Sequence, residues 1–287
     1  MNKILKRLLT GLIGLLLITV GGVHLMAYSM ESGDQKIVEL FAKEGVKVSV
    51  DHLVAEGRSV RVVATDPKLT DSTLIVFVHG APGSWDAYKK YMLDTVLLQK
   101  ARLVAYDRPG YGGSGAESMI DISEQADILK HVIEQYRLPH VVVVGHSYGG
   151  PIVGNIAARY PHLIDRAVMI APLNDPENEP IFWFSHIARW KATKWLLPNG
   201  VKVAGEEKFS HAAELAKMQD LWSELTVPIL HIHGDKDGLA PSLPNIAWSQ
   251  KHIPADVLRL EVLAGEGHLV LWQAYYRVSG LILDFIQ

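Results

Sequence analysis

Hydrophobic residues along this chain follow three patterns in succession. Residues 8–30 are mostly apolar and carry no formal charge. Residues 46–50 and 59–65 then alternate or are β-branched on either side of the turn-prone pair Glu56-Gly57, which predicts a β-hairpin. From residue 74 onwards, short continuous apolar runs alternate with amphipathic stretches. This last pattern is typical of βαβ order and predicts an α/β protein with a mostly parallel sheet flanked by helices.

Each run predicts one element. Strands are expected at residues 74–78, 102–106, 140–145, 166–171, 227–233 and 257–263, and helices at 32–43, 86–99, 121–136, 148–159, 243–252 and 270–286. The first of these helices reads equally well as a linker. Residues 172–226 break the order, because they contain no strand-like run but four of the seven tryptophans, Trp183, Trp190, Trp195 and Trp222. We expect a helical cap there, above the strand ends where ligands of α/β proteins bind.

The uncharged segment at residues 8–30 is long enough to cross a membrane. Its 23 residues would form a helix about 35 Å long, against a hydrocarbon thickness of about 30 Å. The basic residues Lys3, Lys6 and Arg7 precede it. Under the positive-inside rule the N-terminus lies in the cytoplasm and the rest of the chain lies outside. The sequence therefore predicts a single-pass transmembrane helix that serves as a signal anchor.

Two alternatives remain for this segment. A cleaved signal peptide would leave a secreted or periplasmic protein. However, its cleavage site needs small residues, and Leu25 lies two residues before Ala27, the best candidate for the last residue removed. The other alternative is a helix buried in the soluble protein. With the anchor preferred, the chain divides into an anchor at 1–30, a linker at 31–45 and one α/β domain at 46–287.

Composition narrows the functions to consider. Hydrophobic residues make up 48% and charged residues 21% of the 287 positions, as in a folded globular protein. The net charge is −3, and without the three basic residues at the N-terminus 25 basic residues face 31 acidic ones, a balance of −6. Nucleic acid is therefore not an expected partner. Because the chain has no cysteine, a disulfide framework, a cysteine nucleophile and a thiolate metal site are excluded.

A candidate nucleophile follows the strand expected at 140–145. The residues Gly145-His146-Ser147-Tyr148-Gly149 have the spacing GxSxG and lead into a helical stretch. In this context the pattern is typical of a nucleophile elbow, a strained turn that raises the serine clear of the sheet. The glycines let strand and helix approach without Cβ clashes. We expect Ser147 to be a catalytic nucleophile; the alternative is a glycine-rich turn without chemistry.

A serine nucleophile needs a general base, which is itself oriented by a carboxylate. The candidate base is His268, in the loop after the last expected strand; the alternative is a surface-loop histidine. The candidate acid is Asp237, in the turn at 234–241. Asp235 is the second choice, because it lies beside the strand end where it would fix the turn, and Asp175 is the third. The order serine, acid, histidine along the chain is that of nucleophile-elbow hydrolases.

Acyl transfer also needs backbone donors for the oxyanion that develops on the substrate. The amide of Tyr148, directly after the candidate nucleophile, is one candidate. The second is expected in His79-Gly80-Ala81-Pro82-Gly83, after the strand at 74–78. Ala81 is preferred there, because proline has no N–H. His79 is expected to stabilise this turn through a backbone hydrogen bond rather than to react.

These motifs together resemble those of the α/β-hydrolase superfamily. They are HGAPG at 79–83, DRPGYGGS at 107–114, GHSYG at 145–149, and GDKDGLAP at 234–241 with the closing Gly267-His268. The resemblance covers about residues 46–287. It implies the α/β-hydrolase fold, a cap between the sixth and seventh strands, and a triad whose acid is Asp237. The serine sets the chain apart from the epoxide hydrolase and haloalkane dehalogenase branches, whereas HGxPG resembles the loop of esterases, C–C hydrolases and proline iminopeptidases.

Two further motifs imitate other kinds of site. His231, His233 and Asp235 match the start of the metallo-hydrolase signature HxHxDH, but Lys236 stands where the last histidine ligand is needed. Strand alternation already places the two histidines on one face. The segment 107–114 lacks the spacing of a phosphate-binding loop. No metal and no cofactor is therefore expected.

The expected activity is hydrolysis of a carboxylic ester or related small-molecule acyl compound. An aminopeptidase, a C–C bond hydrolase, an acyltransferase and a non-catalytic binding module are the alternatives. Aromatic side chains of the cap are expected to line an apolar pocket above the serine: Phe182, Trp183, Phe184, Trp190, Trp195, Phe209 and Trp222. The first three either belong to the core of the cap or form an exposed wedge that binds an acyl chain or touches a membrane.

Overall fold

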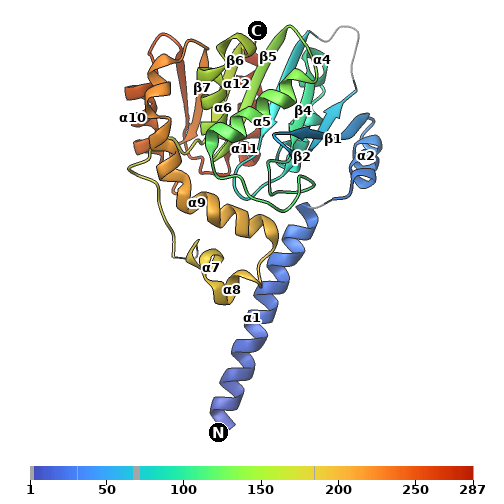
Figure 1. Ribbon diagram of the computed structural model, residues 1–287, viewed down its shortest axis with the longest axis vertical. Coiled ribbons are helices and arrows are strands. Elements are labelled where there is room, and N and C mark those ends of the chain that lie inside the picture. The colour runs from blue at the N-terminus through green and yellow to red at the C-terminus, as the bar shows by residue number, and fades with distance from the viewer. Residues whose placement is uncertain (1–2, 31, 67–71, 184, 287) are drawn as a thin grey trace.

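The structure is a computed structural model of the chain and describes residues 3–30, 32–66, 72–183 and 185–286. Its centre is one eight-stranded sheet with helices on both faces (Figure 1). The strands are β1 Val48–Ala55, β2 Arg58–Thr65, β3 Thr73–Val78, β4 Arg102–Tyr106, β5 His140–His146, β6 Arg166–Ile170, β7 Ile229–Gly234 and β8 Leu258–Leu263. The predicted mostly parallel, helix-flanked sheet is confirmed.

The strands follow the order β1-β2-β4-β3-β5-β6-β7-β8 across the sheet. The pairs β1/β2 and β2/β4 are antiparallel, and all later pairs are parallel. Central strands are continuous apolar runs because helices cover both faces; residues 74–78 of β3 are all buried. Val78 of β3 is paired with Gly145 of β5. The loops that follow these two strands therefore emerge side by side.

Helices cover the sheet in two layers, each with its own apolar core. They are α2 Asp34–Lys43, α3 Lys89–Met92, α4 Leu97–Lys100, α5 Ile122–Glu134, α6 Gly149–Arg159, α10 Ser242–His252, α11 Val270–Gln273 and α12 Tyr275–Phe285, with single turns η1 Trp85–Tyr88 and η2 Pro161–Leu163. The helices α5, α6 and α10 pack on one face of the sheet. The helices α2, α3, α4, α11 and α12 pack on the other.

The helix expected at residues 86–99 is wrong in its extent, because the structure has three short pieces there, η1, α3 and α4. Asp94 causes the break between α3 and α4. Its carboxylate accepts hydrogen bonds from the backbone N–H groups of Val96 and Leu97, at 2.9 and 3.2 Å. A carboxylate in this position caps the start of a new helix, so the chain does not continue the old one.

The helix expected at residues 270–286 is likewise two helices, α11 and α12, which meet at Ala274. Near the junction, the Tyr91 hydroxyl donates a hydrogen bond to the carbonyl oxygen of Leu271 at 2.6 Å. In an uninterrupted α-helix that oxygen would accept from the N–H of Tyr275. A tertiary contact therefore competes with the helical hydrogen bond where the two helices meet.

An insertion between β6 and β7, which we call the cap, contains α7 Ser185–Arg189, α8 Lys191–Lys194, α9 Asn199–Lys217 and η3 Gln219–Glu224. In Figure 1 the cap lies below the sheet: α9 runs beneath the strands, and α7 and α8 lie further out, beside the N-terminal helix α1 Lys3–Met30.

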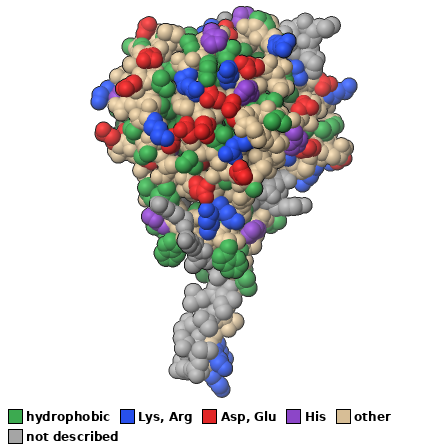
Figure 2. Space-filling view, viewed as in Figure 1, with side chains coloured by type: hydrophobic (Ala, Val, Ile, Leu, Met, Phe, Trp, Pro, Cys, Tyr) green, Lys and Arg blue, Asp and Glu red, His purple; other side chains and the backbone are tan. Residues whose placement is uncertain are grey.

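The expected clustering of cap tryptophans above the nucleophile is wrong. Trp222 is 1% exposed and packs in the main core, where its ring lies against Gly154 of α6. Trp183, Trp190 and Trp195 are 65–78% exposed. The outer cap helices have only five and four residues, so they cover little surface and leave these rings outside. Figure 2 shows hydrophobic side chains around the end of the body from which α1 projects.

The helix α1 is continuous over 28 residues. It contacts the cap where Nε2 of His24 hydrogen-bonds to the carbonyl oxygen of Leu196 at 2.7 Å. Within the part of the chain that the structure describes, no helix is both long and apolar enough to cross a membrane. The side chains of several apolar residues on which the expected span depends, among them Leu8, Leu12 and Leu16, are not described. The predicted transmembrane helix therefore gains no support from the structure.

Candidate active site

Ser147 lies in the turn between β5 and α6, with a φ of +54° in the left-handed region that side chains disfavour. The flanking glycines allow this turn. A Cβ atom on Gly145 would lie 2.1 Å from the carbonyl oxygen of Gly149, and one on Gly149 would lie 2.3 Å from that of Val78. Strand and helix therefore approach as closely as a nucleophile elbow requires.

Two loops bring a histidine and a carboxylate to this serine. Nε2 of His268, in the loop after β8, lies 3.0 Å from Oγ of Ser147. Nδ1 of the same ring lies 2.9 Å from Oδ2 of Asp237, in the loop after β7. These distances suit proton transfer from a hydroxyl to a base that a third group orients.

The surroundings of Asp237 keep its carboxyl group ionised. Its Oδ1 accepts hydrogen bonds from the backbone N–H groups of Leu239 and Ala240, at 2.9 and 2.8 Å. Burial tends to raise the pKa of Asp237, but hydrogen bonds from His233 and His268 outweigh burial and hold that pKa well below its usual range. An ionised carboxylate here can orient the His268 ring and stabilise its protonated form.

The two alternative acids make other contacts. Oδ1 of Asp235 accepts a hydrogen bond from the backbone N–H of Gly265 at 2.7 Å, which fixes the loop that carries His268. Asp175 accepts a hydrogen bond from the side-chain amide of Asn178 at 2.8 Å and stabilises a turn at the start of the cap. Within the described residues, neither acid is hydrogen-bonded to His268.

Two buried histidines behind the site were not predicted from the sequence as site residues. Nε2 of His146 lies 3.0 Å from the carbonyl oxygen of His268. Burial, reinforced by His268, lowers the pKa of His146 to about 3, so its neutral ring can donate this hydrogen bond. Nε2 of His233 lies 3.3 Å from Oδ2 of Asp237. Their signal in the sequence is position: His146 directly precedes Ser147, and His233 lies four residues before Asp237.

The pair of histidines that imitates a metal signature has another role. Nε2 of His231 and Nδ1 of His233 are hydrogen-bonded at 2.9 Å inside β7. Burial, together with His233, lowers the pKa of His231 well below its ordinary value. In the described part of the chain, no three His, Asp or Glu residues are grouped so that they could hold a metal ion.

Both candidate oxyanion donors lie close to the serine. A Cβ atom on Gly80 would lie 3.0 Å from Cβ of Ser147, so the loop after β3 packs directly on the nucleophile. Ala81 and Tyr148 line the same cavity as Ser147. Among the described residues, no hydrogen-bond acceptor is found for either backbone amide. Both amides are therefore available to an oxyanion.

A cavity of about 330 Å³ opens onto Ser147 and His268. This volume lies at the lower end of the range for ligand pockets, about 300–1,000 Å³. Its apolar wall consists of Ala81, Pro82, Leu173, Phe182, Ala188, Val201, Ala204 and Leu239. Of the aromatic side chains expected here, Phe182 is the one that the described lining contains, and Phe184 lies outside the described residues. Small aliphatic side chains thus take the place that the sequence interpretation gave to tryptophans.

One wall of this cavity is charged. Lys208 of α9 forms an ion pair with Glu179, and Nδ1 of His211 lies 3.2 Å from Oε2 of the same carboxylate. Burial tends to raise the pKa of Glu179, but His211 and Lys208 outweigh burial and lower it. The His211 ring also stacks on Tyr148, with ring centroids 4.5 Å apart. The negative charge of Glu179 is therefore balanced within the protein.

A family model described as the alpha/beta hydrolase fold matches residues 73–195, from β3 into the cap. The strand order and the strand-turn-helix at Ser147 agree with that match. The chain has the α/β-hydrolase fold. The fold expected from the sequence motifs is confirmed.

Proteins similar to this chain are described with several different activities. A Synechocystis sp. protein described as a candidate non-heme chloroperoxidase is 26% identical over 256 residues, which cover 74% of this chain and 91% of the relative. The structure of a candidate aryl esterase from Burkholderia cenocepacia has 24% identity and a TM-score of 0.65, and covers 83% of this chain and 97% of its own. The structure of a membrane phospholipase A has 18% identity and a TM-score of 0.64, and covers 98% of both chains. These two structures establish a shared fold, from which the substrate does not follow.

Proposed function

We propose that this α/β-hydrolase is a serine hydrolase that cleaves a carboxylic ester or related acyl compound through an acyl-enzyme. The observation that carries the proposal is the position of His268, within hydrogen-bond distance of both Ser147 and the ionised Asp237. The descriptions of two structures that share the fold, a candidate aryl esterase and a phospholipase A, are compatible with an ester substrate but do not decide it.

In the first half of the reaction, Oγ of Ser147 attacks the acyl carbonyl carbon while Nε2 of His268 takes the hydroxyl proton. Asp237 keeps Nδ1–H of the ring in place and stabilises the positive charge. The amides of Ala81 and Tyr148 donate hydrogen bonds to the oxyanion. When the tetrahedral intermediate collapses, Nε2 returns its proton to the leaving oxygen and the alcohol departs.

In the second half, His268 removes a proton from a water molecule, whose oxygen attacks the acyl carbon of the Ser147 ester. The same two amides stabilise the second oxyanion. Collapse of this intermediate breaks the bond to Oγ, and His268 returns the proton to Oγ. The carboxylic acid is released and the enzyme returns to its starting state.

The wall of the cavity favours an ester over an aminoacyl amide. An aminopeptidase needs an unbalanced acceptor for the substrate ammonium group. The buried carboxylate that lines the cavity, Glu179, already forms an ion pair with Lys208. The remaining lining is mainly small and apolar, which suits an acyl chain of modest length.

We also propose that the N-terminal segment anchors this hydrolase in a membrane, with its catalytic domain outside the cytoplasm. The proposal rests on the sequence: Lys3, Lys6 and Arg7 precede 23 uncharged residues at 8–30. The phospholipase A whose structure covers 98% of this chain is described as a membrane protein, which is consistent with this proposal.

A fluorophosphonate probe tests the catalytic proposal directly, because it forms a covalent bond with an activated serine and releases fluoride. The wild-type protein should be labelled, with the mass increase on the peptide that contains Ser147. Ser147→Ala should not be labelled. A wild-type protein that neither reacts nor hydrolyses any ester would remove the proposal and favour a non-catalytic binding module.

A further inference from the structure

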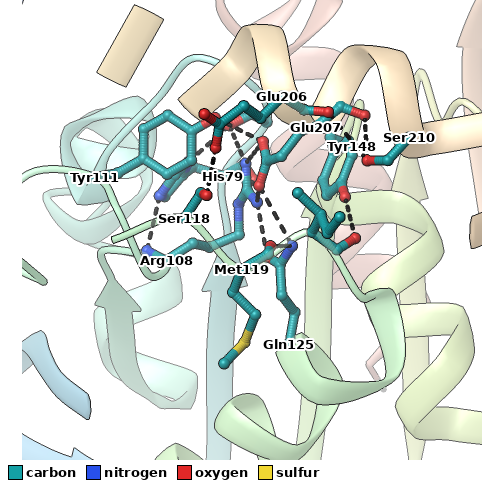
Figure 3. A network of polar contacts seen from close by, with 12 residues as sticks. His79, Arg108, Tyr111, Ser118, Met119, Gln125, Tyr148, Glu206, Glu207 and Ser210 are labelled. Carbon is teal, nitrogen blue, oxygen red and sulfur yellow. Dashed lines mark hydrogen bonds and ion pairs between the residues drawn. The ribbon is translucent and has the colours of Figure 1, made fainter. Parts of the chain in front are cut away.

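A fully buried arginine lies beside the loop that supplies one oxyanion donor (Figure 3). Arg108 follows β4, and its guanidinium group has five N–H donors, all of which are used. Nε donates to the carbonyl oxygen of His79 at 3.0 Å, and Nη2 to that of Gly80 at 2.9 Å. Nη1 donates to Oε1 of Gln125 at 2.7 Å, and both Nη atoms donate to the carboxylate of Glu207 at 2.5 and 3.1 Å. The side chain therefore has one fixed orientation.

The contact with Gly80 has a geometric consequence for its neighbour. The carbonyl oxygen of Gly80 and the amide N–H of Ala81 belong to the same planar peptide group. This peptide bond is trans, so its C=O and N–H point in opposite directions. A guanidinium that binds the oxygen on one side therefore fixes the direction of the Ala81 N–H on the other side, where Gly80 packs on Ser147.

His79 holds the same oxygen from a second direction. Its Nε2 accepts a hydrogen bond from the backbone N–H of Arg108 at 3.0 Å. In a neutral ring the hydrogen is then on Nδ1, which donates to the carbonyl oxygen of Gly80 at 2.7 Å. Burial, with Arg108 nearby, lowers the pKa of His79 well below its ordinary value and keeps the ring neutral. Two donors thus hold one peptide oxygen.

The partner of the arginine comes from the cap. Glu207 lies on α9 and is fully buried, and its Oε2 also accepts a hydrogen bond from the Tyr111 hydroxyl at 2.6 Å. A buried guanidinium without a carboxylate partner is strongly unfavourable, so each of these two side chains requires the other. The position of α9 is therefore linked, through a single side chain, to the orientation of a peptide beside the nucleophile.

We infer that Arg108 and Glu207 are positioning residues for the oxyanion hole: the pair holds the Gly80–Ala81 peptide so that the Ala81 amide faces the oxyanion only when α9 of the cap is docked. The inference rests on the proposed function, because it assumes that this amide stabilises an acyl-transfer oxyanion.

The test measures Glu207→Gln, which removes the carboxylate charge with little change in shape. Loss of an oxyanion donor lowers kcat by about 100- to 1,000-fold, so loss of its positioning should lower kcat for p-nitrophenyl butyrate by about 10- to 100-fold. KM should change by less than about twofold. The inhibition constant of butylboronic acid, whose tetrahedral adduct on Ser147 places an oxygen in the oxyanion hole, should rise by the same factor as kcat falls.

Glu206→Gln is the matched control. Glu206 is the adjacent residue on α9 and also links the cap to the main domain, since its carboxylate accepts a hydrogen bond from the Ser118 hydroxyl at 2.5 Å. It does not line the cavity at Ser147. Its variant should keep kcat and the boronic acid affinity within about twofold of the wild type. Glu207→Asp, which keeps the charge but shortens the side chain, serves as a second variant if Glu207→Gln does not fold.

Several outcomes would overturn the inference. Folded Glu207 variants with wild-type kcat and boronic acid affinity would show that the pair does not position the hole. A raised KM with unchanged kcat would assign Glu207 to substrate binding. If neither variant folds, the pair serves stability rather than positioning. An inactive, unlabelled wild type would instead remove the proposed function and the inference together, so the two failures are distinguishable.

Discussion

Ser147 illustrates how single residues in this site depend on their neighbours. Its positive φ costs about 1–3 kcal/mol for a residue with a side chain. The surrounding backbone maintains that conformation: the N–H of Ser147 donates to the carbonyl oxygen of Ile170 on β6, and its own carbonyl oxygen accepts from the N–H of Gly150, both at 2.9 Å. The strained residue is thus held from the neighbouring strand and from the helix that follows.

Substitutions at the three candidate catalytic residues should lower kcat strongly, whereas a substitution at the neighbouring Asp235 should not. Ser147→Ala and His268→Ala should each lower kcat about 10⁴-fold or more, because such residues act as a unit. Asp237→Asn should approach that loss, since the ring would lose its orienting carboxylate. The measurement is kcat on p-nitrophenyl butyrate, with circular dichroism to verify folding.

Asp235→Asn is the control for this series, because Asp235 binds the Gly265 amide and not the histidine. Its kcat should stay within about tenfold of the wild type. If Asp235→Asn proved inactive while Asp237→Asn kept near-normal turnover, the assignment of the acid would be wrong.

The lowered pKa of His146 should make the folded protein less stable relative to the unfolded chain in mild acid. Its pKa is about 3 in the folded protein and about 6.5 in an unfolded chain, so the unfolded chain binds more protons between these values. Stability contributed by the neutral ring is therefore lost as pH falls below about 6.5, by about 1.4 kcal/mol per pH unit. Replacing the ring in His146→Gln should shrink the loss of unfolding free energy between pH 7 and pH 5 by about 2 kcal/mol.

Urea unfolding at the two pH values measures this difference. The exposed His162 provides the control, and His162→Gln should lose as much stability as the wild type between pH 7 and pH 5. An equal loss in His146→Gln and the wild type would show that His146 does not titrate as its burial requires.

At the scale of elements, the cap determines what the site accepts. The helix α9 supplies Val201, Ala204 and Lys208 to the cavity, and α7 supplies Ala188. A Cβ atom on Gly205 would lie 2.5 Å from Cβ of Ala188, so the two helices are in close contact. The cavity volume is therefore fixed by how these helices pack.

The dependence of kcat/KM on the length of the substrate's acyl chain should reflect the volume of this cavity. Each methylene that enters an apolar cavity contributes about 0.8 kcal/mol, or nearly fourfold in kcat/KM. We expect kcat/KM on p-nitrophenyl esters to rise from acetate to about butyrate or hexanoate and then to fall. Val201→Phe should shift the optimum to shorter chains, and Val201→Ala should shift it to longer ones.

A flat or declining series from acetate onwards, with better turnover of aminoacyl amides, would contradict the ester proposal. If the two Val201 variants shifted the optimum in the same direction, the cavity described at α9 would not be the acyl site.

The aromatic residues of the cap should differ sharply in their contribution to stability. Trp222→Ala should lower the free energy of unfolding by about 3–5 kcal/mol, because its ring is buried against α6 and Trp248. The ring of Trp190 is 65% exposed. Trp190→Ala should therefore change the free energy of unfolding by less than about 0.5 kcal/mol. Denaturant unfolding monitored by circular dichroism compares the two. Equal effects would contradict the different placement of these rings.

The local pattern of apolar and polar residues predicted the strands well but did not predict two breaks in the helices. The strands of the sheet are continuous apolar runs between turn residues, and β3 to β8 lie within about two residues of their predicted bounds. The break at Ala274 escaped prediction because a distant residue, Tyr91, binds the carbonyl oxygen of Leu271. At the break after α3, Asp94 caps the next helix locally, and Tyr275 and Ser279 of α12 hold its other carboxylate oxygen. Motif order alone placed Ser147, Asp237 and His268 as candidates.

The ion pair between the main domain and the cap could not be predicted from the sequence. Arg108 and Glu207 are 99 positions apart, and no motif marks Glu207 as buried. Helical periodicity indicates that residues 199–217 can be a helix, but it does not show which face meets the main domain. The roles given to the cap tryptophans failed for the same reason.

Across the whole molecule, α1 and the cap lie on the same side of the sheet (Figure 1). The cap helices α7 and α9 supply part of the cavity lining. The exposed side chains of Ile181, Trp190 and Ile187 lie on the cap, and α1 contacts the cap through His24 and Leu196. Tryptophan is enriched where proteins meet the membrane interface. Under the proposed anchoring, the cap would therefore lie close to the membrane.

The proposed anchor predicts that the full-length protein stays in the membrane fraction after a high-salt or carbonate wash. A chain that starts at Ser32 should appear in the supernatant, because it lacks the 23 uncharged residues. Protease added to spheroplasts should digest the catalytic domain. The basic N-terminus stays in the cytoplasm, so the catalytic domain lies on the outer side of the membrane.

Recovery of a soluble mature form that begins near Tyr28 would show a cleaved signal instead of an anchor. Protection of the catalytic domain from protease would reverse the proposed topology.

The ion pair between Arg108 and Glu207 limits how this enzyme can be recombined with its relatives. The two charges lie on opposite sides of the junction between cap and main domain, so a chimera that exchanges only the cap would separate them. An unpaired buried charge costs about 3–5 kcal/mol, which is a large part of the stability of a typical domain. Functional chimeras should therefore need the segment 107–114 and α9 from the same parent, although the two are far apart in the gene.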